Sequence, residues 1–270
     1  MVLFRRFLWA VSAVAGFSLC LFASISDTSF SIDQIPLEIP TLVGIEAEPC
    51  EDLVCRNIYP EDGKIEGKTV LQMTPSGVNH HDQIVGRCNL ADSSGPFAFF
   101  RESDGRIWIF RTPSASGQGE FTDVNDSGDA VGFYKKDSIR TDIGFLMNSD
   151  RQWVEDIRYP DNQCPSDKSY LHTQPNGINR TGEIVGNIGC TARPEDATDT
   201  LLYGDGFYRA ADGTFYRVQY KNAVRTVAGK ISDNGVIVGY YVRDNDEWIL
   251  FAALKEDVIR PIVRSESSGR

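Results

Sequence analysis

The sequence is poor in the residues and motifs on which most enzyme active sites depend. Its 270 residues include three histidines. It lacks G-x-S-x-G, H-E-x-x-H and the phosphate loop, which excludes a serine-hydrolase elbow, a zinc-protease helix and a nucleotide-binding loop of the usual kinds. The acidic pairs Glu155–Asp156 and Glu195–Asp196 could serve glycoside hydrolysis, but carboxylates are so common here that no pair stands out.

Long apolar runs are also absent, apart from one at the N-terminus. Two arginines precede an apolar run from Phe7 to about Ala23, which ends in small residues. This pattern predicts a secretory signal peptide over residues 1–24. The alternative is a retained membrane anchor. We favour cleavage because the run is short and small residues follow it, and we expect a secreted or periplasmic protein without membrane contact.

Positive charge is scarce. The net charge is −11, and it becomes −13 after removal of residues 1–24, because that segment carries two arginines and no acids. Such a chain repels phosphate backbones, so we expect no nucleic-acid partner. No cofactor is implied, and we expect a monomer.

What the sequence does contain is a nine-residue motif in four copies. The copies read VNHHDQIVG, VNDSGDAVG, INRTGEIVG and ISDNGVIVG, and they begin at Val78, Val124, Ile178 and Ile231. Successive starts are 46, 54 and 53 residues apart. A repeat of this period is typical of propellers, solenoids or arrays.

Each copy predicts a β-hairpin. The second residue can accept a backbone hydrogen bond two residues on, and a glycine three residues later suits the end of a type I turn. We expect the second strand to end at the glycine of the Ile-Val-Gly run. The predicted structural turn residues are Asn79, Asn125, Gly128, Asn179, Gly182 and Gly235.

A second hairpin follows each motif, so each repeat should hold about four short antiparallel strands. The predicted fold is therefore all-β, a propeller-like array of four repeats with four or five blades. A β-solenoid or a prism of hairpins is the alternative, which the length of the repeats disfavours. No amphipathic helix is expected.

The predicted domain boundaries follow from the repeats. The array should occupy residues 74–263, and residues 264–270 should form a disordered tail. Residues 25–73 are less regular. Within them, PEDGKIEGKTVL (residues 60–71) is similar to a closing hairpin turn and fourth strand, which could complete a fifth, partial blade or close a ring against the C-terminus.

The repeats resemble the extracellular HAF-type repeats of bacterial secreted proteins. The shared pattern is Ile-Asn, two residues, Gly, one residue, Ile-Val-Gly, then a Gly-Phe strand and an Asp-Gly turn, and it covers residues 74–263. The resemblance implies a propeller-like fold and supplies no catalytic residues. The sequence departs from it at Asp82, which replaces the turn glycine, at Ser232, which replaces asparagine, and in lacking His-Ala-Phe.

The third repeat is padded, meaning that two of its connections are longer than those of the other repeats. The gap from the Ile-Val-Gly glycine to the phenylalanine of the third strand is 11 residues in the first repeat (Gly86 to Phe97), and 13 and 12 in the second and fourth. In the third it is 21 (Gly186 to Phe207). The connection that enters this repeat is also long. Both insertions should leave one face of the array, where function often resides, although a loop without a role is nearly as good an interpretation.

The cysteines suggest how the padded face is held. Five lie outside the predicted signal peptide, without zinc-finger spacing. In an oxidising compartment disulfides are the default. Because Cys164 and Cys190 each lie in one padded connection, we predict that they pair, with Cys50–Cys55 as a second, local pair and Cys88 left over.

A metal site is the less favoured interpretation of the first motif. His80, His81 and Asp82 could bind a divalent ion. Adjacent histidines in a tight turn point apart, however, and a third strong ligand is not visible. We expect a surface turn.

Two functions remain open. The first is a non-catalytic secreted scaffold that binds a protein or carbohydrate through the padded loops. The second is an exported hydrolase or lyase that acts on polysaccharide with acidic residues of the same face. The candidate ligand-binding residues are His172, Arg193, Glu195, Asp196 and Tyr203.

Overall fold

A computed structural model of the chain describes residues 8–10, 19–21, 58–91, 95–114, 116–135, 141–160, 170–191 and 204–261. It divides into two compact units, Met1–Cys55 and Arg56–Arg270. In the first unit, β1 (Leu8–Ala10) and β2 (Leu19–Leu21) pair antiparallel. Both strands lie within the predicted signal peptide, which stays a prediction. Among the described residues, no helix has the length and apolar character needed to cross a membrane.

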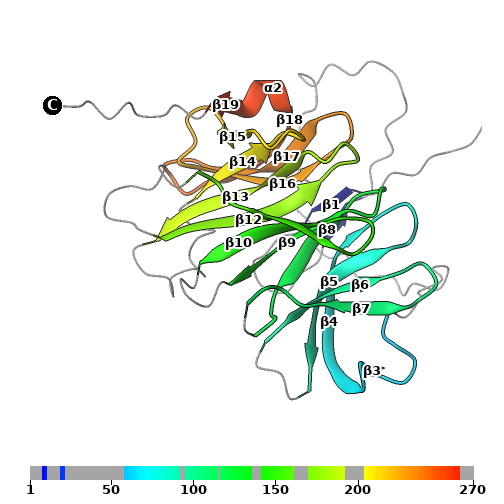
Figure 1. Ribbon diagram of the computed structural model, residues 1–270. Coiled ribbons are helices and arrows are strands. Elements are labelled where there is room, and N and C mark those ends of the chain that lie inside the picture. Colours follow the sequence, from blue (N-terminus) through cyan, green and yellow to red (C-terminus); the bar gives the residue numbers. More distant parts are fainter. Residues whose placement is uncertain are drawn as a thin grey trace, which may run out of the picture. The chain divides into compact units, whose positions relative to one another are not determined.

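The second unit consists of four antiparallel sheets, one for each repeat (Figure 1). The first sheet has the order β3-β4-β5-β6-β7, formed by Lys64–Ile65, Lys68–Val78, Ile84–Leu90, Phe97–Arg101 and Ile107–Phe110. The second has the order β11-β10-β9-β8, formed by Trp153–Ile157, Asp142–Met147, Ala130–Lys135 and Glu120–Val124. The predicted all-β fold is confirmed.

The third sheet has the order β12-β13-β14-β15-β19, formed by Tyr170–Ile178, Ile184–Thr191, Asp205–Arg209, Phe215–Val218 and Ile259–Pro261. The fourth has the order β16-β17-β18, formed by Arg225–Ile231, Val236–Val242 and Trp248–Leu254. The one helix in the described part of the chain is α2 (Lys255–Val258), a single turn.

The expected fourth strand of the last repeat lies in a different sheet. The sequence predicts a second hairpin in this repeat, but β19 pairs with β15 of the third sheet instead of with β18. The turn α2 directs the chain there, because Val258 is buried and its carbonyl accepts a hydrogen bond from the Gln219 N–H, 3.1 Å away. As a result, β18 is the outermost strand of a three-stranded sheet.

The segment before the repeats belongs to the first sheet. The predicted boundary at residues 73 and 74 falls inside β4, and β3 pairs with β4 through Ile65 and Lys68. Residues 64–71 therefore neither form a fifth blade nor pair with the C-terminal strand. Ile65 is buried against Met73, which gives this addition a core contact of its own.

The predicted motif turns are confirmed. Gly128, Gly182 and Gly235 have φ values of 86°, 79° and 77°, and Asp82 takes the same left-handed conformation with a φ of 56°. In the third repeat the Asn179 Oδ1 accepts hydrogen bonds from the backbone N–H groups two and four residues on, at 3.1 and 2.9 Å.

The Ile-Val-Gly glycine does not end its strand, as the sequence suggested, because each second strand continues beyond it. Opposite this glycine the register of the first strand shifts, as between Phe121 and Asp123, and a carbonyl projects toward the second strand. A Cβ on Gly132 would lie 2.0 Å from the Glu120 oxygen, and one on Gly239 would lie 2.0 Å from the Val227 oxygen. Only glycine fits beneath this bulge.

A phenylalanine of the third strand pairs with each of these glycines. The partners of Gly132 and Gly186 are Phe145 and Phe207. In the first repeat the partner of Gly86 is Phe99 rather than the expected Phe97. The corrected gap there is 13 residues, as in the second repeat, so the third repeat stands out more clearly.

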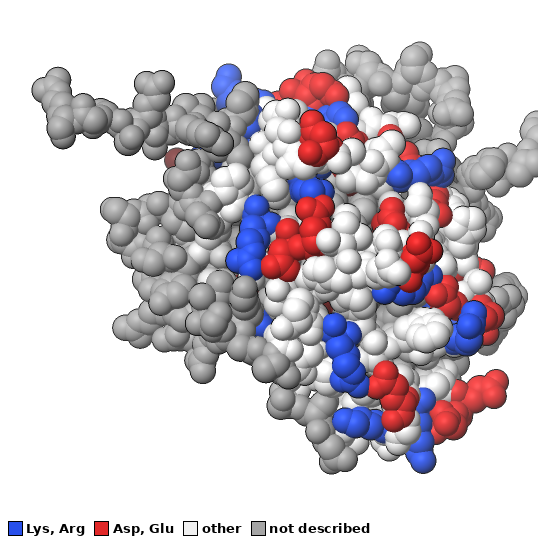
Figure 2. All heavy atoms as spheres, in the orientation of Figure 1, with Lys and Arg blue, Asp and Glu red and all other residues white. Residues whose placement is uncertain are grey.

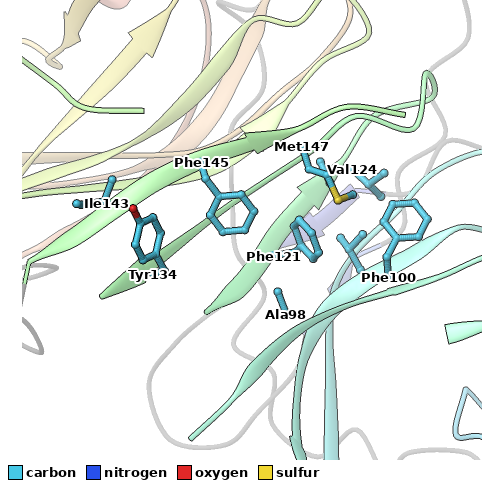
Figure 3. Packing of buried hydrophobic residues seen from close by; sticks show 10 residues of the cluster. Ala98, Phe100, Phe121, Val124, Tyr134, Ile143, Phe145 and Met147 are labelled. Carbon is cyan, nitrogen blue, oxygen red and sulfur yellow. The ribbon is translucent and has the colours of Figure 1, made fainter. Parts of the chain in front are cut away.

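Buried aromatic side chains hold neighbouring sheets together (Figure 3). Phe121 of β8 lies between Phe100 of the first sheet and Phe145 of β10, with ring centroids 6.5 and 5.3 Å away. Phe121 and Phe145 are 1% and 0% exposed. Each sheet therefore buries one face against the next, as packed β-layers require.

The motif asparagines also join consecutive repeats. The Asn79 side-chain amide donates to the Asn125 carbonyl at 2.8 Å, Asn125 donates to the Asn179 carbonyl at 3.0 Å, and Asn179 donates to the Ser232 carbonyl at 3.2 Å. The same side chain thus closes its own turn and fixes the next one. In the described residues, Ser232 of the fourth repeat accepts the bond from Asn179 through its carbonyl and does not donate one to another motif turn.

The first strands of the repeats meet at a common axis. At one equivalent position the four residues are Gly77, Asp123, Gly177 and Lys230. A Cβ on Gly77 would lie 2.9 Å from the Asp123 Cα, and one on Gly177 would lie 2.9 Å from the Lys230 Cα. The Lys230 Nζ reaches the Asp123 Oδ1 at 2.9 Å, although their repeats are not consecutive. This contact between the second and fourth repeats is the geometry of a propeller-like array.

We expect Lys230→Met to lower the free energy of unfolding by about 1–3 kcal/mol, because Asp123 and the Thr122 carbonyl lose a charged donor in a mostly buried place. The matched control is Arg243→Met, whose ion pair with Glu247 is half exposed and screened by solvent, so this variant should lose much less stability. Thermal unfolding of both variants measures the difference. Equal melting temperatures would contradict the axial role of Lys230.

Candidate functional site

The array has two different ends. We call the end that carries the motif turns (residues 79–83, 125–129, 179–183 and 232–235) the turn end. The opposite end carries the connections between sheets and between the second and third strands, and we call it the connection end. The two padded stretches both join strands there: β11 to β12, and β13 to β14.

Basic and acidic side chains alternate from repeat to repeat at the turn end. The residues that follow the motif Asn or Ser are His80, Asp126, Arg180 and Asp233. The His80 Nδ1 lies 2.9 Å from both Asp126 carboxylate oxygens, and the Arg180 guanidinium donates to Asp126 at 2.8 Å and lies 3.5 Å from Asp233. These side chains fasten adjacent turns to one another.

These contacts between adjacent turns shift the pKa of the central carboxylate, Asp126. Burial alone would raise the pKa of Asp126, but the His80 backbone N–H, the Arg180 guanidinium and the His80 ring together hold it well below its usual value of 3.8. A carboxylate with a lowered folded-state pKa adds stability above its unfolded pKa, and this stability is lost as the pH falls through the folded pKa.

We therefore expect Asp126→Asn to lower the melting temperature at pH 7 and at pH 5. The difference in melting temperature between the variant and the unaltered protein should narrow below about pH 4. Thermal unfolding of both proteins across this range measures the effect. A difference that stayed constant down to pH 2 would show that the carboxylate charge is not the cause.

The metal candidates do not converge. His80 is engaged with Asp126, the His81 backbone N–H donates to the Asn79 Oδ1, and Asp82 takes the place of the turn glycine. The described residues contain no group of three or more side chains suited to a metal ion. The first motif forms a turn, in which the Asn79 N–H donates to the Gln83 carbonyl at 3.2 Å.

Other charges toward the turn end are also paired. The Arg151 guanidinium contacts the Glu102 carboxylate at 2.7 Å and lies 3.6 Å from the centroid of the Phe100 ring. Glu183 accepts hydrogen bonds from the Lys255 ammonium and the Tyr208 hydroxyl, each at 2.5 Å. Figure 2 shows acidic and basic side chains interleaved over the visible face rather than gathered in a patch of one sign.

At the connection end, His172 of β12 is buried and faces β10. Its Nδ1 accepts a hydrogen bond from the Asp142 backbone N–H at 3.0 Å and lies 3.3 Å from that residue's carboxylate. The Gln174 amide donates to the same carboxylate at 2.7 Å. His172 and Asp142 are 1% and 2% exposed, so the predicted ligand-binding histidine lies beneath the surface, between the second and third sheets.

Two further carboxyls at this end, Glu120 and Asp205, are partly buried. Burial raises the pKa of Glu120 although Arg87 lies 3.1 Å away, and the charge of Asp142 raises it further. Burial likewise raises the pKa of Asp205, against the opposing effect of its ion pair with Arg217. Carboxyls of this kind accept protons more readily than exposed ones.

Tyr159 lies close to the Asp205–Arg217 pair. It is 1% exposed and follows β11, and its backbone N–H donates to the Thr173 Oγ1 at 3.1 Å. Burial raises its pKa to about 12, with opposing contributions from Arg217 and Asp205. Its hydroxyl has no hydrogen-bond partner in the part of the chain that the structure describes.

Most of the buried side-chain polar atoms that lack a hydrogen-bond partner lie toward the connection end. Among the described residues five buried side-chain atoms lack a hydrogen bond, and four of them belong to residues at or near strand ends on this side: Asp142, Tyr159, Arg217 and Arg225. The fifth is the Asn187 Oδ1, in the middle of β13. Each such atom costs about 1–3 kcal/mol. The turn end carries none of the five.

The structure tests only part of the predicted site. Arg193, Glu195, Asp196 and Tyr203 lie outside the described residues. The same holds for Cys50, Cys55 and Cys164, so both predicted disulfides stay predictions. Cys88 is buried and free, as expected of the leftover cysteine, and burial raises the pKa of its thiol to about 12.

The acidic pair on β11 is structural. Glu155 accepts a hydrogen bond from Arg209 at 2.6 Å, whereas Asp156 accepts one from the Tyr134 hydroxyl at 3.1 Å and one from Arg158 at 2.9 Å. Because successive residues of a strand point to opposite faces, these two carboxylates do not act on one substrate atom. The suggestion that they form a glycoside-cleaving pair is wrong.

Sequence reasoning missed Asp142, Tyr159, Arg217 and Arg225. Each lies at or near the end of a strand, where polar side chains are common, so position alone gave no signal. The sequence offered one usable sign, an arginine at the start of the strand Arg225–Ile231, whose middle residues Val227, Ala228 and Gly229 are apolar.

The fold defines a class: an all-β, propeller-like repeat protein. Within its described residues, the buried side-chain polar atoms of the turn end have hydrogen-bond partners, whereas several at the connection end do not. No protein-family model and no curated protein matches the sequence. Among solved structures, one titled "Streptogramin B lyase structure" is similar over 66% of this chain and 54% of that chain, with 14% sequence identity and a TM-score of 0.32. The chain thus spans about half the length of that structure.

Proposed function

We propose that this protein is an exported, non-catalytic scaffold that binds a protein or carbohydrate at its connection end, around the second and third sheets. The observation that carries the proposal is the one-sided distribution of unpartnered buried polar atoms. Export rests on the predicted signal peptide, and the HAF-type resemblance agrees with a secreted repeat protein.

The physical reason is the cost of these atoms. Native proteins pair nearly all their buried polar groups, and the exceptions call for an explanation. The turn end shows that this chain can satisfy its charges across repeats, so the Tyr159 hydroxyl and the Asp142 Oδ1 are not a general defect. A bound ligand's polar groups would pair with them. Under this proposal Arg193, Glu195, Asp196 and Tyr203 complete the site.

The test is a binding screen of the mature protein against polysaccharides and candidate proteins, repeated with Tyr159→Phe. We expect this variant to keep its melting temperature, because it removes an unpartnered hydroxyl, and to bind about ten-fold more weakly. The control is Tyr134→Phe, whose hydroxyl already bonds Asp156. Binding unaffected by Tyr159→Phe and Asp142→Asn would contradict the proposed site.

A polysaccharide-cleaving enzyme is the second candidate. Glu120 and Asp205 favour it, because a buried carboxyl with a raised pKa suits a general acid. Turnover of a polysaccharide that is abolished by Glu120→Gln or Asp205→Asn would support the enzyme. Binding without turnover would support the scaffold.

The predicted Cys164–Cys190 disulfide belongs to the same proposal. It would join the two padded connections and, in the chain-entropy account, stabilise by roughly 3 kcal/mol. Peptide mapping without reductant identifies the pairing. A link from Cys88 to either cysteine would refute it, and the burial of Cys88 argues against such a link.

A further inference from the structure

We propose that Arg225 and Trp248, at the connection end of the fourth sheet, form a binding site for a sugar that carries a carboxylate. This inference rests on the binding role proposed above and names the ligand class for one part of that end. It is based on a buried arginine that has no counterion among the described residues.

Arg225 is a buried arginine without a counterion among the described residues. It is the first residue of β16 and is 5% exposed, yet it forms no ion pair with any described carboxylate, and its Nε has no hydrogen-bond partner. Arg209, which is 8% exposed, shows the usual arrangement, because Glu155 accepts its hydrogen bond at 2.6 Å. Arginines are almost never buried unless they are paired. The Arg225 guanidinium is therefore available to an anion.

An exposed indole lies beside this guanidinium. The Arg225 Cζ is 4.9 Å from the centroid of the Trp248 ring, and that ring stacks on Tyr240 with centroids 4.8 Å apart and planes 29° apart. Trp248 is nevertheless 50% exposed, on the outermost strand of the sheet. Its neighbours hold the ring in place, so stacking a ligand on it costs little conformational entropy. A half-exposed, fixed aromatic ring suits the apolar face of a sugar.

The charge of the ligand follows from the surroundings. Arg243, on the adjacent turn, is already paired with Glu247 at 3.0 Å, which leaves one guanidinium for one anion. The net charge of −11 disfavours densely charged polyanions. A planar carboxylate matches the fork of a guanidinium. These conditions point to a uronic-acid type of sugar, with one carboxylate on each ring.

Isothermal titration of the mature protein with trigalacturonate, and with its methyl ester, tests the assignment. We expect the acid to bind at least ten-fold more tightly than the ester, because the ester cannot form the charged pair. Arg225→Met should weaken binding of the acid at least ten-fold. Its melting temperature should stay unchanged or rise, because an apolar chain replaces an unpaired buried charge.

The matched control for Trp248→Ala is Trp108→Ala. Trp108 is 49% exposed and has the Arg106 guanidinium 5.9 Å from its ring, but Arg106 is already paired with Asp104 at 2.7 Å. Trp248→Ala should weaken binding several-fold, and Trp108→Ala should leave it unchanged.

Four results would overturn the assignment: no binding of millimolar trigalacturonate, equal binding of acid and ester, undiminished binding by Arg225→Met, or a lowered melting temperature of that variant. Binding of an acidic peptide in place of the sugar would also overturn it. None of these results decides the binding role proposed for the second and third sheets. That role is tested separately, by Tyr159→Phe with the ligands found in the binding screen.

Discussion

Gly132→Ala should strongly destabilise the protein. The added Cβ would lie 2.0 Å from the Glu120 carbonyl oxygen and 2.9 Å from the Phe121 Cα. Both atoms belong to the backbone of a paired strand, so neither can move without breaking the bulge. We expect a loss of about 3–5 kcal/mol in the free energy of unfolding. At roughly 2–4 °C per kcal/mol, the melting temperature should fall by about 6–20 °C.

The control is Gly182→Ala, which separates crowding from backbone conformation. No atom lies within 4 Å of a Cβ at Gly182, but its φ is 79°. The cost there is the left-handed conformation alone, about 1–2 kcal/mol. If the two variants melted at the same temperature, the explanation of the Ile-Val-Gly glycine by its bulge would be wrong.

Asn179→Ala should have the second largest effect. This side chain is 2% exposed, and its Oδ1 accepts the backbone N–H groups of Thr181 and Glu183 while its amide donates to the Ser232 carbonyl. Truncation leaves several buried groups unpaired and cuts one link between the third and fourth repeats. We expect a loss of about 2–4 kcal/mol, measured by chemical denaturation.

The equivalent residue of the last repeat supplies the comparison. The Ser232 hydroxyl accepts one hydrogen bond, from the Val236 N–H at 3.0 Å, and it is exposed. Ser232→Ala should therefore cost no more than about 1 kcal/mol. A loss as large as that of Asn179→Ala would show that the asparagine acts only within its own turn.

The sequence predicted local structure well because the local causes are visible in it. The asparagine and glycine of the motif enforce a hairpin wherever they occur, and the departure at Asp82 changes nothing, since an aspartate tolerates the left-handed conformation. The departure at Ser232 is also understandable from the structure, because among the described residues Ser232 donates no bond to another motif turn.

The candidate site was less accessible to sequence reasoning. His172 was predicted to bind a ligand, which stays a prediction, and its burial against Asp142 depends on how the second and third sheets pack. The polar residues that remain without partners, such as Tyr159 and Arg225, look ordinary in the sequence. Their distinction is a missing contact, and a missing contact exists only in a packed structure.

The four repeats, their turns and the all-β fold follow from the sequence alone, because strand alternation and turn chemistry act over a few residues. Which strand completes which sheet, and which charges are paired, depends on the packed structure. The strand β19 pairs with β15 of the third sheet rather than with a strand of its own repeat. Lys230 pairs across the axis with Asp123, which lies 107 positions earlier in the chain. Contacts of this kind depend on how the sheets pack, which the period of a motif does not encode.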